Sequence, residues 1–450
     1  MPVNFKLKKG FDIRLKGSAT KVIAGDVNST LFGLRPGDFP GLTPKLTVKP
    51  GDQVKAGSPL FASKVRPEIT FTSPVSGVVK SINRGDQRRI LEVVVEKQGE
   101  DYIDFGKDDP GKLKRQEIIA RMLVSGLWPS VRQRPYHVIA NPNDTPKSVF
   151  VSGFDTAPLA PDLNFVAENT PPGYLRSGFQ VLNALSGGKV HLVLDGKSTQ
   201  SATLAGITGV EISYFSGPHP AGNTGVHIHH LDPVSKGEVV WYVNLQDVAT
   251  IGRLFCDGVY RPERIIAFTG SEVSEPSYFR VTSGASIANL VSGRLKSENC
   301  RIISGNVLTG TAISADGFLG YYDSQVTVIP EGNYHEFFGW MMPGASKHSF
   351  SKTFLSALAG KKEFRLDTNM HGGHRAFVMT GQYEKVVPMD ILPMQLLKAI
   401  IAEDIDNMEN LGIYEVAEED LALCEYICSS KIEIQSVVRK GLDLMMKEMN

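Results

Sequence analysis

The sequence is poor in cysteine and has no long apolar run. Its 450 residues include four cysteines, Cys256, Cys300, Cys424 and Cys428. The amino-terminal segment MPVNFKLKKGF lacks the apolar core of a secretory signal. The longest apolar stretch near the end, ILPMQLLKAIIA at 391–402, contains a proline and a lysine and is well short of the ~20 residues that span a bilayer. We therefore expect a protein of the reducing cytoplasm, with no transmembrane segment, that reaches a membrane only through partners.

The sequence also has no excess of charge of either sign. Lys+Arg and Asp+Glu both number 48, so no overall field attracts the chain to nucleic acid, and we expect no nucleic-acid partner. A hydrophobic content of 42% with 21% charged residues is typical of ordinary soluble proteins. At about 150 residues per domain, the length predicts three or four domains.

Several motifs that carry chemistry are missing. There is no G-x-G-x-x-G, no G-x-S-x-G and no H-E-x-x-H, and no pair of carboxylates stands out from ordinary surface charge. The nearest approach to a phosphate loop runs from Gly305 to Ala312, but Thr311 and Ala312 occupy the positions of the required lysine and hydroxyl. The residues alone therefore predict a multidomain α/β protein without a self-evident active site.

The stretch from Pro44 to Val95 predicts a small barrel of short strands. Alternating apolar residues are interrupted by glycine turns in VKPGDQVKAGSPL and again in SPVSGVV. This pattern resembles the biotinyl/lipoyl family, the barrel-sandwich hybrid, in which a modified lysine lies in a hairpin between the two halves. In this register the lysine position falls on Pro67, and Lys64 lies three residues early. The resemblance thus implies the fold without the carried group.

The hydrophobic periodicity of the rest of the chain predicts three further domains. A helix is predicted from Lys112 to Gly126, and strands alternate with helices to about residue 255, which is typical of a three-layer α/β domain. A compact β-α-β unit follows, and helices are predicted in SFSKTFLSALAG at 349–360 and in the segments after it. In the last helix five apolar residues share one face: Ile434, Val437, Val438, Leu442 and Met445. The predicted domains are 1–100, 101–255, 256–330 and 331–450.

A histidine-rich run, GPHPAGNTGVHIHH, raises the question of a metal site. It carries His219, His227, His229 and His230, and imidazoles at this density could bind zinc or copper. No cysteine or carboxylate lies within the run to complete a ligand set. On a strand, His227 and His229 would share one face. A turn that uses histidine hydrogen bonds is favoured over a metal site.

Cys424 and Cys428 lie in the run CEYIC near the end of the chain. Bacterial ferredoxins hold a cluster with C-x₂-C-x₂-C-x₃-C-P, but here Glu418 and Leu421 stand at the first two ligand positions and Ser429 replaces the proline. Two thiolates do not hold a four-iron cluster, so two buried thiols on one helix face are favoured.

Seven segments in order carry a family resemblance. They are FTSPVSGVVKSINRG, SGLWPSVRQRPY, GPHPAGNTGVHIHHLDPV, YVNLQDVATIGRLF, RIISGNVLTG, YEKVVPMDILP and EEDLALCEYIC. Over almost its whole length the chain resembles the family of peripheral A subunits of the bacterial Na⁺-translocating NADH:quinone oxidoreductase. The resemblance implies a barrel-sandwich hybrid, a Rossmann-like α/β domain, a β-grasp (SLBB-type) domain and a helical C-terminal domain.

The same order is similar to two flavin- and cluster-binding relatives, the C subunit of the Rnf complex and the NADH-binding subunit of respiratory complex I. Those relatives have a GGAGFP-type stretch where this chain has Ser125-Gly126-Leu127-Trp128-Pro129. The tail is similar to the Rnf ligand run without its first two cysteines. The resemblance therefore implies no covalently bound cofactor here, with flavins and a 2Fe–2S cluster on other subunits.

The resemblance implies that quinone is the substrate and that the partners are the other subunits, especially the membrane subunits, at the cytoplasmic face of the inner membrane. Quinone binding needs an apolar slot with one or two donors for the carbonyls. The predicted slot joins a loop with apolar side chains to a second segment: Phe32, Leu34, Phe39 and Leu42 with Trp128, Arg132, Arg134, Tyr136 and His137. The alternative is that these residues form a domain interface or dock onto a membrane protein of the complex, and that the chain is a structural adaptor.

Overall fold

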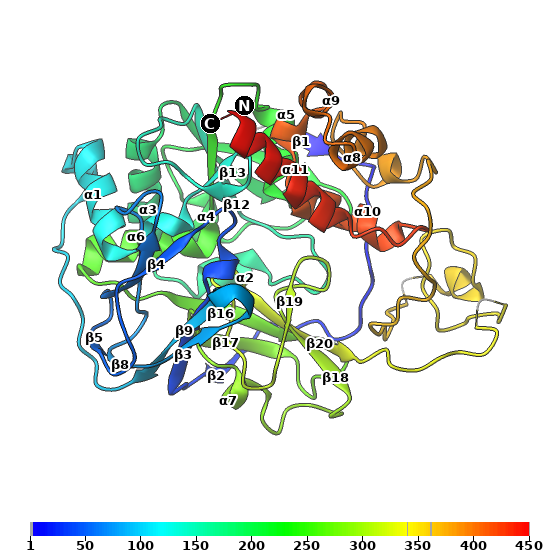
Figure 1. The fold of residues 1–450 in the computed structure, drawn as a ribbon, viewed down its shortest axis with the longest axis horizontal. Helices are drawn as coiled ribbons and strands as arrows, with labels where there is room; N and C mark the ends of the chain where they lie inside the picture. The colour runs from blue at the N-terminus through cyan, green and yellow to red at the C-terminus, as the bar shows by residue number, and fades with distance from the viewer. Residues whose placement is uncertain (1–2, 340, 361, 450) are drawn as a thin grey trace.

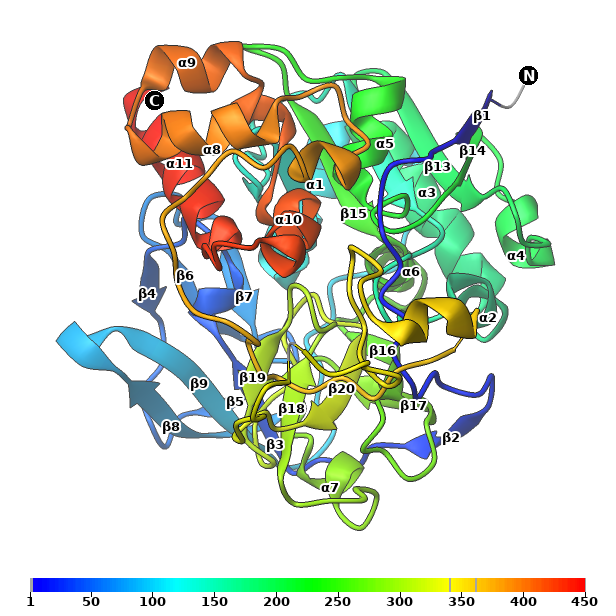
Figure 2. The ribbon, with the colours of Figure 1, turned by 90° about the vertical axis from the view of Figure 1, so that its right-hand side faces the viewer.

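The computed structural model describes residues 3–339, 341–360 and 362–449. Three sheet-containing parts and a helical part pack together, with the C-terminal helices, drawn in orange and red, lying over one end of the green sheet (Figures 1 and 2). The fold is mixed α/β, as the sequence predicts.

The barrel-sandwich hybrid consists of two small sheets. The first has the order β3-β9-β8-β5 and the second β4-β6-β7. Leu60, Phe61, Phe71 and Val79 fill the space between them and are almost fully buried. Pro67 lies in the exposed turn between β6 and β7, as the register predicts. The strands are β3 (Leu31–Leu34), β4 (Pro44–Leu46), β5 (Gln53–Val54), β6 (Pro59–Ser63), β7 (Thr70–Thr72), β8 (Gly77–Arg84) and β9 (Ile90–Lys97).

The Rossmann-like part is a seven-stranded sheet in the order β1-β14-β13-β12-β15-β10-β11. Its first five members are parallel, and β10 and β11 add antiparallel edges. The strands are β1 (Val3–Lys6), β10 (Arg132–Arg134), β11 (Val138–Ile139), β12 (Ser148–Ser152), β13 (Lys189–Asp195), β14 (Glu211–Ser216) and β15 (Val240–Asn244). The helices are α1 (Arg115–Ser125), α2 (Leu163–Glu168), α3 (Pro172–Leu185), α4 (Ala202–Ala205), α5 (Thr224–Leu231) and α6 (Leu245–Asp257).

Helices cover both faces of this sheet. Alternate strand residues divide between two cores: Val149 and Leu192 pack with α3 and α6, whereas Phe150 and Val193 pack with α5. The predicted helix at 112–126 is confirmed as α1, which ends at Gly126 in the left-handed conformation (φ 75°).

The β-grasp part is a six-stranded sheet in the order β19-β18-β20-β16-β17-β2. Its elements are β2 (Ile23–Asp26), β16 (Glu263–Thr269), β17 (Ser277–Thr282), α7 (Ala288–Val291), β18 (Cys300–Ser304), β19 (Thr311–Ile313) and β20 (Gln325–Pro330). The segment from Gly305 to Gly310 joins the antiparallel strands β18 and β19. It therefore opens no helix, as a phosphate loop would.

The amino-terminal strands belong to two sheets outside the barrel. Val3 of β1 pairs with Ser213 of β14, and Ile23 of β2 pairs with Tyr278 of β17. The predicted domain 1–100 places both strands with the barrel, whereas the structure uses them to bind the other two sheets. Backbone hydrogen bonds of β1 and β2 therefore join the amino-terminal segment to the Rossmann-like sheet and to the β-grasp sheet.

Among the described residues of the C-terminal part, the α-helices begin at residue 393. Its helices are α8 (Pro393–Ile401), α9 (Ile405–Asn410), α10 (Ala422–Ile427) and α11 (Ile434–Met449). The predicted face of α11 is confirmed, since Ile434, Val438, Leu442 and Met445 are fully buried and Val437 is partly buried against the same core.

The helix predicted in SFSKTFLSALAG is wrong. Within residues 349–360 the structure has only a 3₁₀ turn at Leu355–Ala359. Leu355 and Leu358 remain 57% and 86% exposed, so no apolar face is buried to stabilise a longer helix. In the part of the chain that the structure describes, no helix is both long and apolar enough to cross a membrane.

Candidate functional site

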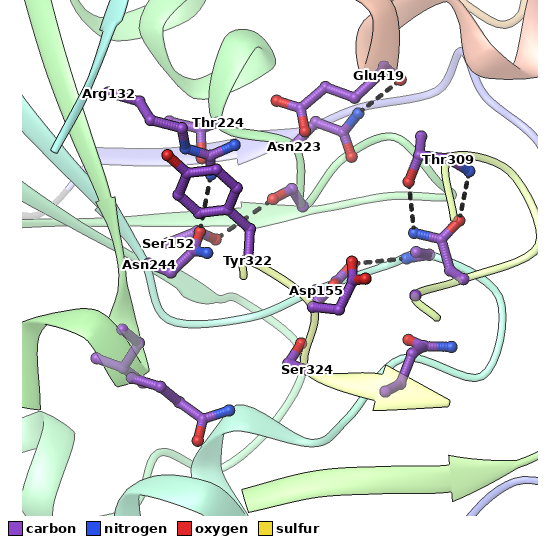
Figure 3. A pocket seen from close by; sticks show the side chains of 18 of the residues that line it. Arg132, Ser152, Asp155, Asn223, Thr224, Asn244, Thr309, Tyr322, Ser324 and Glu419 are labelled. Atoms are coloured by element: carbon purple, nitrogen blue, oxygen red, sulfur yellow. Dashed lines mark hydrogen bonds between the residues drawn. The ribbon is translucent and has the colours of Figure 1, made fainter. Parts of the chain in front are cut away.

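A pocket of about 370 Å³ lies where the order of the Rossmann-like sheet reverses (Figure 3). The chain passes from β12 to β13 and β14 on one side and then returns to place β15 on the other side of β12. Ser152 and Asn244, the last residues of β12 and β15, pair in register, and both line the pocket. Carboxyl ends of parallel strands at such a reversal are where α/β sheets bind ligands.

Every part of the molecule contributes to this pocket. Pro40 comes from the loop after β3, Tyr322 from the β-grasp part and Glu418 from the helical part. The β14–α5 loop and the start of α5 add Asn223 and Thr224. The site is therefore a product of domain assembly rather than of one domain.

Arg132 is the central cation of the pocket. Its guanidinium lies between two aromatic rings, 4.6 Å from the centroid of Tyr242 and 4.3 Å from that of Tyr322. One terminal nitrogen donates to Asn244 Oδ1 (3.2 Å), the other lies 3.2 Å from His137 Nε2, and the buried Nε has no partner among the described residues. Stacking on both faces fixes the plane of the guanidinium, and its Nε–H is the donor left for a ligand.

His137 links Arg132 to the helical part. Its Nδ1 lies 3.0 Å from Glu418 Oε2, and Glu418 also accepts a hydrogen bond from Arg439 (3.1 Å). Burial alone would raise the pKa of Glu418, but His137 and Arg439 outweigh it and lower the pKa from 4.5 to about 2. The carboxylate of Glu418 is thus charged at neutral pH and holds the histidine ring in place.

The depressed pKa of Glu418 predicts acid sensitivity with a definite sign. A folded-state pKa below the unfolded value contributes stability above about pH 4.5, and this contribution disappears as the pH falls toward 2. We expect Glu418→Gln to lower the free energy of unfolding at pH 7 and to differ progressively less from the native chain as the pH falls from 5 to 3. Urea unfolding at several pH values measures the difference.

The exposed Glu68→Gln serves as the control for this pH series and should follow the native curve. A gap between native and E418Q that stays constant down to pH 3 would contradict the assignment.

Two partly buried carboxyl groups add proton-binding capacity at the pocket. Burial raises the pKa of Asp38 and of Asp323. Asp323 accepts a hydrogen bond from Ser304 (2.5 Å), and Asp38 accepts one from the backbone N–H of Tyr321 (2.9 Å). The pocket therefore combines fixed donors with carboxyls that protonate more readily than exposed ones.

The residues of the predicted quinone slot lie in different places in the structure. Arg132 and His137 line the pocket, and Phe39 packs behind it, with its ring 5.7 Å from that of Tyr322. Arg134 is fully buried in ion pairs with Glu419 (3.2 Å) and Asp420 (3.0 Å). Tyr136 packs against Tyr414 in the core of the helical part.

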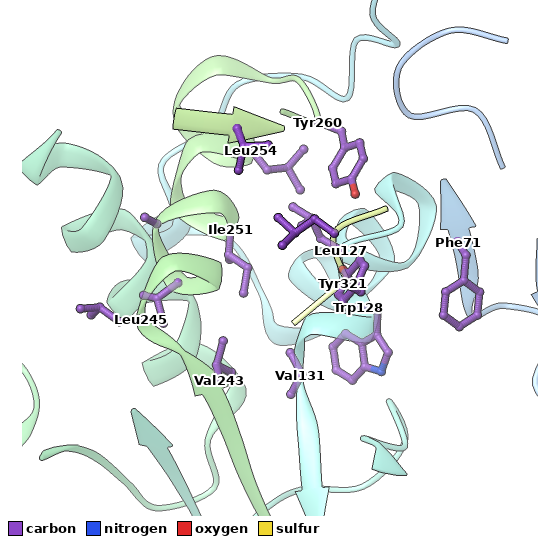
Figure 4. Close-up of a cluster of buried hydrophobic side chains, with 14 of the residues drawn as sticks. Phe71, Leu127, Trp128, Val131, Val243, Leu245, Ile251, Leu254, Tyr260 and Tyr321 are labelled. Carbon is purple, nitrogen blue, oxygen red and sulfur yellow. The ribbon is translucent and has the colours of Figure 1, made fainter. Parts of the chain in front are cut away.

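The remaining predicted residues lie in the large core, not at the pocket. Phe32 and Leu34 are buried in β3, Leu42 packs partly buried against the same core, and Trp128 is fully buried. Trp128 donates its indole N–H to Ala140 O (2.8 Å) and packs edge-to-face on Trp241, with Leu127 beside it (Figure 4). The bulky pair Leu127 and Trp128 is thus part of the packed core.

The histidine run forms a helix rather than a strand, because His227, His229 and His230 lie in α5. Each imidazole has its own protein partner: His219 with Thr156, His227 with Ala221 O, His229 with Glu415 and His230 with Pro388 O. Burial lowers the pKa of His227 to about 4. Within residues 3–339, 341–360 and 362–449 no group of three or more His, Cys, Asp or Glu side chains could hold a metal.

Cys424 and Cys428 are both buried. The Tyr383 hydroxyl donates to Cys428 Sγ (2.9 Å), and burial raises the pKa of Cys424 well above its ordinary value. Both side chains form part of the core of the helical part, so the predicted burial is confirmed. The predicted shared helix face is not, because α10 ends at Ile427 and Cys428 is extended.

Sequence reasoning missed most of the polar side chains at the pocket, among them Tyr322, Asn244, Ser152, Asn223 and Thr224. The available signal was the position of Ser152 and Asn244 directly at the ends of two apolar strands. Their meeting depends on strand order, which a single sequence does not give.

The fold and the pocket define a multidomain α/β protein with a polar ligand site between its domains. Three family models match successive parts of the chain: the NqrA N-terminal barrel-sandwich hybrid domain at 5–98, the NqrA second alpha/beta domain at 113–260 and the NQRA C-terminal domain at 265–315.

Proteins named as the A subunits of Na(+)-translocating NADH-quinone reductases are similar over nearly the full length. Those of Yersinia pestis bv. Antiqua (strain Angola) and Klebsiella pneumoniae (strain 342) are 40% and 39% identical over 447 and 449 residues, covering 98% of this chain and 99% of each relative. The chain therefore belongs to the NqrA family, the A subunits of the Na⁺-translocating NADH-quinone reductase, which is a sodium translocase. A solved NAD⁺-reducing NiFe hydrogenase is similar at a TM-score of 0.40 and 12% identity, over 75% of this chain and 62% of that one, which is too weak to carry an argument.

Proposed function

We propose that this protein binds quinone in the pocket at the end of β12 and β15 and takes part in its reduction to quinol, coupled in the complex to Na⁺ export. Arg132, held between two tyrosine rings with a free Nε, carries the proposal. The relatives named above are, by their printed name, A subunits of NADH-quinone reductases, which supports a quinone rather than another flat, oxygen-bearing ligand.

The geometry suits a quinone headgroup. A cavity of 370 Å³ falls in the range of small-molecule sites, and the ring of Tyr322 offers an apolar wall beside the donors of Arg132 and Asn244. Reduction places negative charge on the carbonyl oxygens, where a pre-oriented guanidinium stabilises it most. Asp38 and Asp323, with raised pKa values, are groups of the right kind to exchange the two protons that a quinol needs.

In this proposal, the two electrons that reduce the quinone come from flavins and a 2Fe–2S cluster on other subunits. The residues at the corresponding positions of this chain do not fit such groups, since Leu127 and Trp128 fill one space and Tyr383 caps Cys428. The chain is then a peripheral component on the cytoplasmic face of the membrane and not a catalyst by itself.

Titration of the full chain with a short-chain soluble quinone tests the proposal. We expect saturable binding, and an increase in Kd of about tenfold or more in Arg132→Gln, since a charge-assisted hydrogen bond contributes about 1.5–3 kcal/mol. Arg84→Gln, an exposed arginine of the barrel, should bind like the native chain. A photoreactive quinone should crosslink to residues that line the pocket. Absence of binding, or equal affinity in all three chains, would refute the proposal.

The second candidate function is that of an adaptor that clamps the membrane subunits without binding quinone. One observation favours it: the segment 337–358 leaves large apolar side chains exposed, namely Phe337, Met341, Met342, Leu355 and Leu358. Apolar surface of this kind marks interaction sites, and the membrane subunits of the complex are the partners proposed for it. The quinone titration separates the two functions, because an adaptor has no saturable quinone site.

A further inference from the structure

A second, smaller cavity of about 200 Å³ lies between the Rossmann-like and β-grasp parts. It is bounded by the start of α3, the side of α6 and the strands β16 and β17. Four arginines line it, and they come from different elements: Arg253 from α6, Arg261 from the following loop, Arg264 from β16 and Arg280 from β17. Among the described residues, the one carboxylate that lines it is Glu263.

The nearby carboxylates do not neutralise these arginines. Arg253 pairs with Glu263 (2.6 Å) and Asp257 (3.2 Å), and Arg264 pairs with Asp247 (2.5 Å). In the part of the chain that the structure describes, Arg261 and Arg280 have no carboxylate partner. Arg261 lies over the ring of Tyr102 (4.2 Å), and Arg280 donates to Asn169 O (3.5 Å). Four guanidinium groups against these three carboxylates leave a net charge of about +1 at the cavity.

Buried donors at the cavity are also unused. Arg264 is 5% exposed, and its Nε has no hydrogen-bond partner within the described ranges, although its terminal nitrogen pairs with Asp247. The Nε of Arg261 is likewise buried without a partner there. Leaving a charged donor buried and unpaired is costly, so these two atoms indicate a ligand with acceptor oxygens.

The N-terminal end of α3 also adds positive potential to the cavity. Asn169, Thr170 and Pro171, directly before this 14-residue helix, line the cavity together with Tyr174 of its first turn. The N-terminal end of a helix carries partial positive charge and favours anions. The same end of α3 faces the arginines of the β-grasp sheet, so the two sources of positive potential add.

We propose that this cavity binds the phosphate group of a small phosphate-bearing molecule, either a soluble phosphate compound or the headgroup of an anionic lipid. Guanidinium groups that converge from several elements match a tetrahedral oxyanion, which accepts hydrogen bonds on all sides, better than a planar carboxylate. The volume holds a phosphate and the first atoms attached to it. Arg264 and Gln246 line both this cavity and the pocket of Arg132, so an anion here lies one side chain away from that pocket.

Calorimetric titration of the full chain with inorganic phosphate and with pyrophosphate, at low ionic strength, tests the site. We expect saturable binding that weakens about tenfold for each arginine removed, as measured in Arg261→Gln, Arg280→Gln and the double variant. Arg176→Gln is the matched control, because it removes an exposed arginine from α3 without touching the cavity. Modification of Arg261 by phenylglyoxal, followed by peptide mass, should slow when pyrophosphate is present.

Vesicles separate the two sources of phosphate. If the chain sediments with phosphatidylcholine vesicles only when they contain phosphatidylglycerol, and pyrophosphate releases it, the ligand is a lipid headgroup. If free pyrophosphate binds and the vesicles do not, the ligand is soluble; both results support the site. No binding of any of these anions, or equal binding by the double variant and Arg176→Gln, would overturn it. Neither result depends on whether quinone binds.

Discussion

Replacing Arg134 with alanine is expected to lower the free energy of unfolding by about 3–5 kcal/mol. The side chain is fully buried and pairs with Glu419 and Asp420 of the helical part, and Asp420 is buried as well. Without the guanidinium, a carboxylate is left uncompensated inside the protein, which costs more than the lost attraction. Chemical denaturation monitored by tryptophan fluorescence measures the change.

A double variant distinguishes this cause from simple loss of volume. Arg134→Met with Asp420→Asn removes both charges, keeps an oxygen to accept the backbone N–H of Ala417, and is expected to recover a large part of the lost stability. If the double variant is as unstable as Arg134→Ala, the buried carboxylate is not the cause. Because Glu418 and Glu419 line the pocket beside Arg132, Arg134→Ala should also weaken quinone binding.

Gly252→Ala is expected to destabilise the chain by about 3 kcal/mol, although alanine is the better helix former by about 1 kcal/mol. A Cβ at Gly252 of α6 would lie 1.8 Å from the carbonyl oxygen of Tyr174 and 2.6 Å from the backbone nitrogen of Gly178, both in α3. These are backbone atoms, so the two helices must separate. Thermal unfolding of the full chain measures the effect.

Gly173→Ala is the matched control for this substitution. It lies in the first turn of α3, where an added Cβ meets nothing within 4 Å, so its stability should equal or slightly exceed that of the native chain. A Gly252→Ala variant that unfolds like the native chain would show that the helix crossing tolerates expansion. Since α3 and α6 both border the arginine cavity, their separation should also weaken anion binding there.

Local patterns predicted much of the fold. The end of α1 at Gly126, the exposed turn at Pro67 and the buried face of α11 each depend on residues close in sequence. The helix predicted at 349–360 failed because Leu355 and Leu358 have no surface to pack on, and a helix of this length is marginal without a buried face. The run around His227 was open to a strand interpretation because its short apolar pattern does not separate the two periods.

The site was predictable only in part. Arg132 and His137, two of the predicted residues, line the candidate pocket. The rings that stack on Arg132, those of Tyr242 and Tyr322, lie far along the chain on two other elements. Phe32 and Trp128 were assigned to a ligand because aromatic side chains suit a quinone, yet the cores of the barrel and of the Rossmann-like part require them for packing. The sequence alone does not show whether an apolar residue in a loop packs in the core or contacts a ligand.

The strands β1 and β2 have a consequence for how the protein is made. Val3 pairs with Ser213, and Ile23 pairs with Tyr278, so on the ribosome the first strands wait for partners that emerge more than two hundred residues later. At roughly 5–20 residues per second this delay is on the order of 10–50 s. During that time the nascent chain can complete its barrel, while β1 and β2 lack their partner strands and stay open to wrong pairing.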